Sequence, residues 1–233
     1  MTPEELLAAG YDVPGAAYER LVAFVQTLLA ENERVNLTGA RDEAAVWPHV
    51  CDSLAFVERV RRAGARQALD LGSGGGLPGL PLACVCDDVE VTLLDATAKK
   101  VAAVERIATA LGLGNVRTLC GRAETLAHEG AQREQYDAVA VRAVAVLALG
   151  LEYAAGYLRV GGECWLYKSA AGLAAERGPA EGAATACGLV HVEDVSYLLP
   201  GESEPRVLVG YRKAAALRPE LPRSPGQAKK RPL

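Results

Sequence analysis

The chain has 233 residues, half of them hydrophobic and 23% charged, so it can bury a sizeable core and wholesale disorder is excluded. At about 150 residues per domain, this length corresponds to one or two domains. The formal net charge of -4 hides an asymmetry, because residues 211–233 carry a net +6 and the remaining 210 residues carry -10. A basic tail on an acidic body is typical of a segment that contacts a polyanion, although tails that only improve solubility have the same composition.

The N-terminus and the apolar runs predict where the protein resides. Acids follow Met1 where a signal peptide would carry positive charge. The longest uncharged apolar run, residues 143–151, is much shorter than the roughly 20 residues that span a bilayer. We therefore expect a cytoplasmic protein with no membrane partner. The six cysteines are scattered through apolar segments, as expected for reduced thiols, and Cys84 with Cys86 has no second ligand pair, so no metal is expected.

The first 65 residues carry helical apolar spacing, through Leu21, Val25 and Leu28 and again from Val46 to Val60. From Gln67 onwards, short apolar runs alternate with helical stretches. The predicted strands cover residues 68–71, 89–94, 116–120, 136–141, 162–167, 189–195 and 207–211. The predicted helices between them cover residues 80–86, 99–111, 144–158 and 173–186. This alternation predicts an α/β fold with a mostly parallel, Rossmann-like sheet, and the closing hairpin adds one antiparallel strand.

A glycine-rich segment, Gly72 to Gly79, lies where the first strand gives way to the next helix. Glycines allow backbone N–H groups to approach a ligand closely, and Pro78 is well placed to begin a helix. Ligands of open parallel sheets bind at this edge. The segment can be aligned with the G-x-G-x-x-G pattern of dinucleotide-binding proteins, but that match alone is weak.

Two acids stand at successive strand ends beside the glycine segment. Asp70 would repel a pyrophosphate and would hold a ligand that presents an ammonium group. Asp95 can accept hydrogen bonds from both ribose hydroxyls. Either acid could instead cap a helix. Residues 121–124 are placed to border an adenine ring, and a Gly-Gly turn precedes the fifth strand. Together with the two acids, these features favour an S-adenosylmethionine methyltransferase over a dehydrogenase.

An ordered set of motifs resembles the bacterial small-subunit rRNA guanine-N7 methyltransferases, the RsmG family, also known as glucose-inhibited division protein B. The likeness extends over nearly the whole chain. It is carried by Asn36-Leu-Thr38, His49-Val-Cys-Asp52-Ser53-Leu54, Leu69 to Leu82, Leu93-Leu-Asp95 with Lys99-Lys100, Gly121-Arg-Ala-Glu124, Arg142-Ala143 and Pro225 to Leu233. Two positions depart from the family pattern: Val141 stands where Ser is usual, and Ser169 where Gly is usual.

The resemblance implies a class I S-adenosylmethionine-dependent methyltransferase domain over residues 66–213, preceded by a helical region, 1–65, and followed by a basic tail, 214–233. It implies S-adenosylmethionine as the cofactor and 16S rRNA of the small ribosomal subunit as the partner. The implied cofactor contacts are Gly72, Leu77, Ala123, Glu124 and Arg142, with Asp95 for the ribose. No catalytic base is assigned, because guanine N7 offers a free lone pair. We expect a monomer.

Basic side chains could form a discontinuous rim for RNA around the crevice. The candidates are Lys99, Lys100, Arg142, Lys168, Arg223, Lys229, Lys230 and Arg231. Arg142 could contact the target base or the cofactor. His49 and Asp52 could face the crevice or make contacts within the helical region.

Three other functions stay open at this point. A small-molecule methyltransferase of the same fold would not need the basic tail, so removal of residues 218–233 would leave its activity untouched. A non-catalytic, ribosome-associated RNA-binding module would bind no cofactor. A dehydrogenase would bind a nicotinamide cofactor. Methylation of an exocyclic amino group is not favoured, because Val141-Arg-Ala-Val144 stands where such enzymes carry Asp/Asn-Pro-Pro-Tyr/Phe.

Overall fold

Seven strands form one sheet in the order β3-β2-β1-β4-β5-β7-β6. The strands are β1 (Gln67–Leu71), β2 (Glu90–Asp95), β3 (Val116–Cys120), β4 (Tyr136–Val141), β5 (Leu158–Ser169), β6 (Leu189–Tyr197) and β7 (Arg206–Lys213). All pairs are parallel except those of β7, which runs antiparallel to both β5 and β6. The predicted sheet with one antiparallel strand is therefore confirmed. The computed structural model describes every residue except Pro232, and the side chains of Pro225 and Lys229 are also outside the described part.

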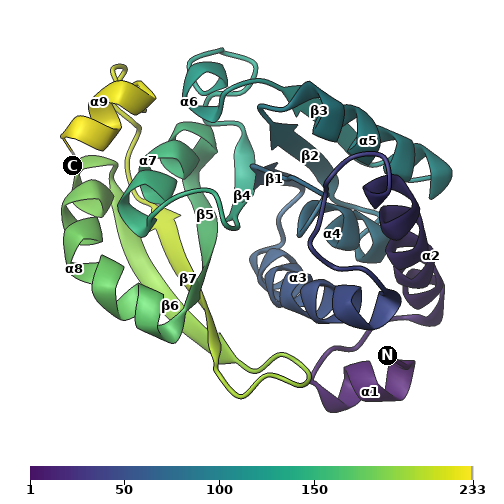
Figure 1. Ribbon diagram of the computed structural model, residues 1–233. Helices are drawn as coiled ribbons and strands as arrows, with labels where there is room; N and C mark the ends of the chain where they lie inside the picture. The colour runs from purple at the N-terminus through teal and green to yellow at the C-terminus, as the bar shows by residue number, and fades with distance from the viewer. Residues whose placement is uncertain (232) are drawn as a thin grey trace.

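Two layers of helices cover the sheet (Figure 1). The helices are α1 (Pro3–Ala8), α2 (Gly15–Asn32), α3 (Glu43–Ala63), α4 (Gly79–Val85), α5 (Ala98–Ala110), α6 (Ala123–Leu126), α7 (Leu147–Tyr157), α8 (Ala170–Ala186) and α9 (Pro225–Lys230). Helices α2 to α5 pack on one face, and α7 and α8 pack on the other. No helix among the described residues is both long and apolar enough to cross a membrane.

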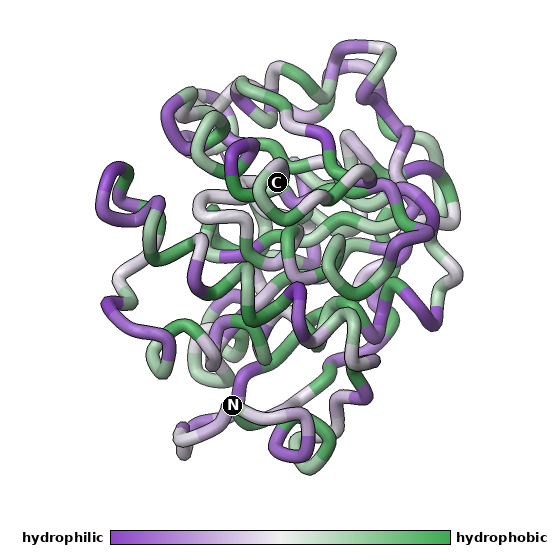
Figure 2. The backbone as a smooth tube through the Cα atoms, turned by 90° about the vertical axis from the view of Figure 1, so that its right-hand side faces the viewer, coloured by the Kyte–Doolittle hydropathy of each residue, from purple (hydrophilic) through white to green (hydrophobic). Residues whose placement is uncertain are grey.

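Side chains alternate between the two faces along each strand, as the pleat requires. In β4, Ala138 and Ala140 belong to the core beneath the N-terminal helices, and Val139 and Val141 belong to the core beneath α7 and α8. Figure 2 shows the hydrophobic stretches gathered in the interior, with the most hydrophilic stretches at the periphery. The helices of residues 1–65 share a core with the sheet, so they are layered onto the methyltransferase-like domain.

β5 begins earlier than predicted. Gly161 and Gly162 were expected to form a turn before this strand, but they lie within it, where the pairing register with β4 shifts between Tyr136 and Ala138. A glycine in the left-handed region, at φ +87° for Gly161, tolerates this irregularity because it has no Cβ.

The basic tail folds back onto the domain. Leu217, Leu221 and Ala228 are buried. The guanidinium of Arg133 donates hydrogen bonds to the carbonyl oxygens of Leu217 (3.1 Å), Arg218 (3.0 Å) and Leu221 (2.9 Å). Residues 214–231 therefore form part of the folded body. Their charged side chains differ in exposure and in ion-pair partners.

Candidate active site

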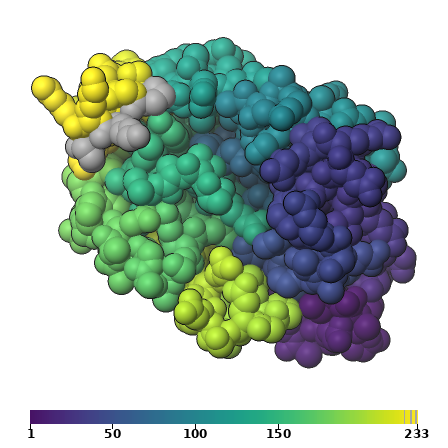
Figure 3. Space-filling model, viewed as in Figure 1, coloured from purple at the N-terminus to yellow at the C-terminus, as the bar shows by residue number. Residues whose placement is uncertain are grey.

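A cavity of about 650 Å³ opens at the carboxyl ends of β1, β2, β3 and β4. Figure 3 shows it as a hollow between the blue N-terminal segment and the teal and green segments. This volume lies within the roughly 300–1,000 Å³ typical of small-molecule sites, and its position is the one expected for ligands of parallel sheets. The residues lining it include Gly72, Leu77, Asp95, Ala123, Glu124 and Arg142. The fold thus brings all six expected cofactor contacts to one cavity.

The glycine segment forms a tight loop after β1. Gly72, Gly74 and Gly76 have φ values of +78°, +54° and +87°. The N–H of Gly72 donates to the carbonyl oxygen of Leu94 (2.8 Å), which ties the loop to β2. A Cβ atom on Gly72 would lie 2.4 Å from Cγ2 of Val144. Both backbone conformation and space therefore restrict this position to glycine.

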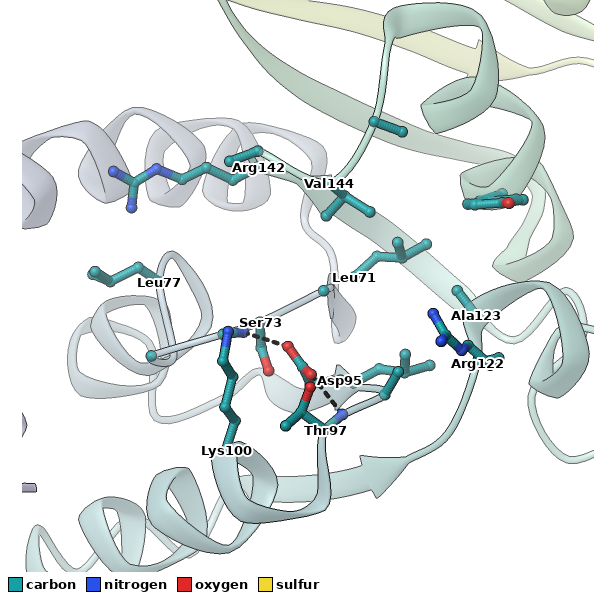
Figure 4. Close-up of a pocket in the computed structure, with 18 of the residues that line it drawn as sticks. Leu71, Ser73, Leu77, Asp95, Thr97, Lys100, Arg122, Ala123, Arg142 and Val144 are labelled. Atoms are coloured by element: carbon teal, nitrogen blue, oxygen red, sulfur yellow. Dashed lines mark hydrogen bonds between the residues drawn. The ribbon is translucent and has the colours of Figure 1, made fainter. Parts of the chain in front are cut away.

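Asp95 fixes the other side of the same loop. Its Oδ2 accepts a hydrogen bond from the N–H of Gly74 (3.0 Å), and its Oδ1 accepts one from the N–H of Thr97 (2.7 Å); both appear as dashed lines in Figure 4. Each carboxylate oxygen can accept a further hydrogen bond. The side chain lines the cavity, so a pre-oriented carboxylate and a close-approach glycine loop together fit the ribose and backbone contacts of a nucleoside cofactor.

Asp70 lies beneath the loop. Its side chain is buried, its Oδ2 accepts a hydrogen bond from the N–H of Gly79 (2.9 Å), and its Oδ1 has no partner among the described residues. Burial raises the pKa of this carboxyl to about 7. Asp70 is not among the described residues that line the cavity. The structure therefore gives it a role in holding the loop, where the sequence had predicted contact with a ligand ammonium group.

Arg142 is held by a polar network that joins β4 to α3 and β6. Its Nε forms an ion pair with Oδ2 of Asp52 (2.9 Å), its Nη2 donates to Nδ1 of His49 (3.0 Å), and the hydroxyl of Tyr197 donates to Oδ1 of Asp52 (2.6 Å). The guanidinium carbon lies 5.9 Å from the ring centroid of Tyr167. Burial lowers the pKa of His49, and the charge of Arg142 lowers it further, so this imidazole is neutral at neutral pH.

This network resolves the question left open for His49 and Asp52. Both face Arg142, and His49 also lines the cavity. In Figure 4 the Arg142 side chain extends away from Asp95. The contribution of Tyr197 was missed, because a tyrosine 145 positions from Asp52 gives no local signal.

The segment between β4 and α7 forms another wall of the cavity, through Ala143, Val144 and Ala145. Ala143 has a φ of +55°, which is unusual for a residue other than glycine. Lys168 donates from Nζ to the carbonyl oxygen of Ala145 (3.0 Å) and pairs with Oε2 of Glu176 (2.7 Å). Its side chain is 11% exposed, so its charge is engaged within the fold.

A further loop, between α2 and α3, covers the glycine segment. The carboxamide of Asn32 organises it, since its Oδ1 accepts from the N–H groups of Leu37 (2.8 Å) and Thr38 (3.0 Å) and its Nδ2 donates to the carbonyl oxygen of Thr38 (3.0 Å). Leu37 and Thr38 line the cavity. Asn32 was not identified from the sequence. The motif Asn36-Leu-Thr38 marked the loop, but the side chain that holds it lies one helical turn earlier.

The structure separates the RNA-binding candidates into different environments. Lys99, Lys230 and Arg231 are exposed, and Lys100 is half-buried at the cavity. Arg223 instead pairs with the buried Glu152. The side chain of Lys229 lies outside the described residues. Among the residues that the structure describes, no cluster of three or more His, Cys, Asp and Glu side chains could hold a metal ion.

Comparison with protein families matches residues 17–196 to the GidB model, described as rRNA small subunit methyltransferase G. A ribosomal RNA small subunit methyltransferase G of Chloroflexus aggregans is 36% identical over 99% of this chain and 96% of its own length. The protein of the same name from Deinococcus deserti is 37% identical over 100% of this chain and 98% of its own length.

Solved structures with low sequence identity share the fold. An O-methyltransferase of Bacillus cereus in complex with SAH superposes with a TM-score of 0.59, 15% identity and coverage of 82% of this chain and 91% of its own. The [4+2]-cyclase SpnF superposes with a TM-score of 0.57, 14% identity and coverage of 87% of this chain and 97% of its own. These likenesses concern the arrangement of helices and strands.

Proposed function

Because the chain belongs to the GidB family of ribosomal RNA small subunit methyltransferases G, we propose that it methylates N7 of one guanine in 16S rRNA. The chain is an S-adenosylmethionine-dependent rRNA methyltransferase. The observation that supports the cofactor side of this proposal is the single cavity where Asp95, the glycine loop and residues 121–124 converge.

Bound S-adenosylmethionine supplies a sulfonium methyl group that a lone pair can accept in one displacement. Asp95 would hold the ribose hydroxyls, while its bonds to the N–H groups of Gly74 and Thr97 keep the carboxylate oriented. Ala123 and Glu124 would border the adenine. The wall formed by Arg142 to Ala145 faces the same cavity, and we assign it to the side where the target base enters.

Guanine N7 presents its lone pair at neutral pH, so no side chain has to remove a proton. With the cofactor held by Asp95 and the glycine loop, its methyl group would pass from sulfur to N7 and the positive charge would pass to the base. The chain then has to align two reactants, and alignment can contribute about 7–11 kcal/mol in favourable cases. Asp52, which pairs with the cavity-lining Arg142, is also engaged by Tyr197, consistent with a positioning role.

Mass spectrometry of rRNA tests the proposal. Small ribosomal subunits and naked 16S rRNA from cells that lack this methyltransferase are incubated with the protein and S-adenosylmethionine, and the modified nucleotide is mapped. We expect one N7-methylguanosine. Asp95→Ala should weaken cofactor binding at least tenfold by calorimetry, because charge-assisted hydrogen bonds contribute about 1.5–3 kcal/mol. Absence of methyl transfer to either RNA substrate would refute the proposal.

We also propose that the protein acts as a monomer in the cytoplasm. One chain already brings all six expected cofactor contacts to the cavity, and the proposed substrate is a ribosomal subunit of the cytoplasm. Light scattering of the purified protein tests the oligomeric state, and a dimer at working concentration would contradict it.

A further inference from the structure

Ion pairs are unevenly distributed over this molecule. Most Arg and Lys side chains that the structure describes have a carboxylate oxygen within 4.0 Å, and Arg133 instead donates to backbone carbonyl groups. Within the described side chains, those that have neither kind of partner are Arg41, Arg61, Lys99, Lys100, Arg122, Lys230 and Arg231. An ion pair cancels most of its own field, so these residues dominate the positive potential that an approaching ligand meets.

Two of these cations line the cavity, and two more stand within three residues of a lining residue in the sequence. We call Arg41, Lys99, Lys100 and Arg122 the cationic rim. Lys100 and Arg122 line the cavity, and Figure 4 shows them on opposite sides of Asp95. Lys99 precedes Lys100 in the first turn of α5.

Arg41 comes from a different segment of the chain, three residues after the cavity-lining Thr38. It follows the loop whose Leu37 and Thr38 line the cavity, and that loop is held by Asn32 and by the bond from the N–H of Ala40 to Oγ1 of Thr38 (3.2 Å). The rim thus combines three separate segments: the α2–α3 loop, the start of α5 and the end of β3.

The rim is presented to solvent. Arg41, Lys99 and Arg122 are exposed and Lys100 is half-buried. The acids within the cavity are engaged or shielded, since Asp95 accepts two backbone hydrogen bonds and Glu124 is 9% exposed. Of the seven cations without a carboxylate or backbone partner among the described residues, two therefore line the crevice and two more stand close to lining residues in the sequence. Their field acts over the Debye length of about 8–10 Å, so it is felt at the mouth of the cavity.

We propose that the cationic rim binds the RNA phosphates that flank the target nucleotide. The inference rests on the proposed function and adds the path of the substrate. A base that leaves its stack to enter the cavity brings its flanking phosphates to the mouth. Lys100 and Arg122, which line the cavity on opposite sides of Asp95, are placed to meet phosphates on two sides of such a base. Arg142, Lys168 and Arg223 are already engaged with Asp52, Glu176 and Glu152, so they lie outside this contact set.

Salt-dependent binding tests the rim directly. The dissociation constant for small ribosomal subunits that lack the modification is measured over a range of salt concentrations for wild type, Arg41→Gln, Lys99→Gln and their double variant. Each lost phosphate contact should reduce the slope of log K against log salt by about 0.7–0.9, and the double variant by about twice that. Cofactor affinity should not change, because neither residue is among those lining the cavity.

Arg61→Gln is the matched control. Arg61 is also exposed and has no carboxylate partner among the described residues, but it lies near Gly64 and Val89, at the amino ends of β1 and β2. The slope of log K against log salt for Arg61→Gln should equal that of wild type. The assignment of the rim to RNA phosphates would be overturned if both single rim variants kept the wild-type slope. It would also be overturned if Arg61→Gln reduced the slope as much as the rim variants do.

Naked 16S rRNA distinguishes RNA from a protein partner. If the rim variants lose affinity for subunits but retain wild-type slopes on naked rRNA, the rim contacts a ribosomal protein and the assignment to phosphate is overturned. If wild type shows the rim-dependent slope on both substrates but transfers no methyl group, the proposed function fails while the rim assignment stands.

Discussion

Gly72 illustrates how a single residue can couple two walls of the site. Its φ of +78° is one that side chains rarely adopt, and Val144 occupies the space where a Cβ would lie. Because Val144 comes from the segment after β4, the glycine determines how closely the cofactor loop and the target-side wall approach each other.

Gly72→Ala should therefore cost more than backbone strain alone. Gly112 has a similar φ of +64°, and a Cβ there would have nothing within 4 Å, so Gly112→Ala should lose only about 1–2 kcal/mol of stability. We expect Gly72→Ala to lose more and to weaken S-adenosylmethionine binding. Val144→Ala in the same chain should restore part of the loss. Urea denaturation and calorimetry measure the two effects, and equal losses at the two glycines would show that the contact with Val144 is unimportant.

Asp70 predicts an unusual pH dependence. Its pKa rises from 3.8 to about 7 through burial, so the fold favours the protonated carboxyl. The stabilisation is present in full below about pH 4 and is lost as the pH rises through 7. Asp70→Asn removes this titration. Its stability relative to wild type should increase between pH 5 and pH 8, as measured by denaturant midpoints.

Asp137 supplies a control of opposite sign. Burial opposes its ionisation, but hydrogen bonds from Arg159 and from the N–H groups of Arg66 and Gln67 lower its pKa overall. Asp137→Asn should therefore lose stability relative to wild type as the pH rises towards about 4, and the difference should stay constant at higher pH. The same trend for both variants would contradict the assignment for Asp70.

At the scale of elements, the segment from β4 to α7 is shaped by its neighbours. Arg142 is bound by Asp52, the carbonyl oxygen of Ala145 by Lys168, and the N–H of Leu147 by Glu176. These contacts hold a conformation that includes a positive φ at Ala143. The segment is thus a preorganised wall of the cavity.

Lys168→Met should loosen this wall. The variant removes the bond to Ala145 and leaves Glu176 without its partner, so we expect kcat for rRNA methylation to fall at least tenfold. The salt slope of RNA binding should stay at the wild-type value, because the ammonium does not reach phosphate. A slope reduced by about 0.7, with kcat unchanged, would instead support the contact with RNA that the sequence suggested.

The short helices show where local patterns cease to be informative. The predicted strands and long helices all occur, with ends displaced by a few residues. Helices α1, α6 and α9 have only six, four and six residues, too few to display a helical period. They were missed for that reason, although Thr2 forms a capping box with Glu5 that marks the start of α1.

At the scale of the whole molecule, the tail is a structural element. Glu152 is 2% exposed, and it accepts hydrogen bonds from the backbone N–H (2.7 Å), Nε (2.9 Å) and Nη2 (2.7 Å) of Arg223. Arg212 and Lys213 pair with Glu163 and Glu134. Much of the +6 counted from the sequence is therefore neutralised by acids of the body.

Arg223→Ala should destabilise the protein by about 3–5 kcal/mol, because it leaves the buried carboxylate of Glu152 without a compensating positive charge. Arg218→Ala is the matched control. Arg218 pairs with Glu220 on the surface, where the two side chains are 57% and 62% exposed, and its loss should cost less than about 1 kcal/mol. Urea denaturation compares them. Similar losses would contradict a structural role for the tail. Removal of residues 218–233 should likewise lower stability, so it cannot isolate RNA binding.

The sequence by itself determined the sheet, the glycine loop and the position of Asp95. These follow from residue types within a single strand or turn, and every parallel strand delivers its last residues to the same edge. Only the tertiary structure decided which cations are available to RNA. Lys168, Arg142 and Arg223 look alike in the sequence to Lys99 and Arg41, but they find carboxylates at positions 176, 52 and 152. A charge is free or neutralised according to distances through space, and most of those distances connect residues far apart in the chain.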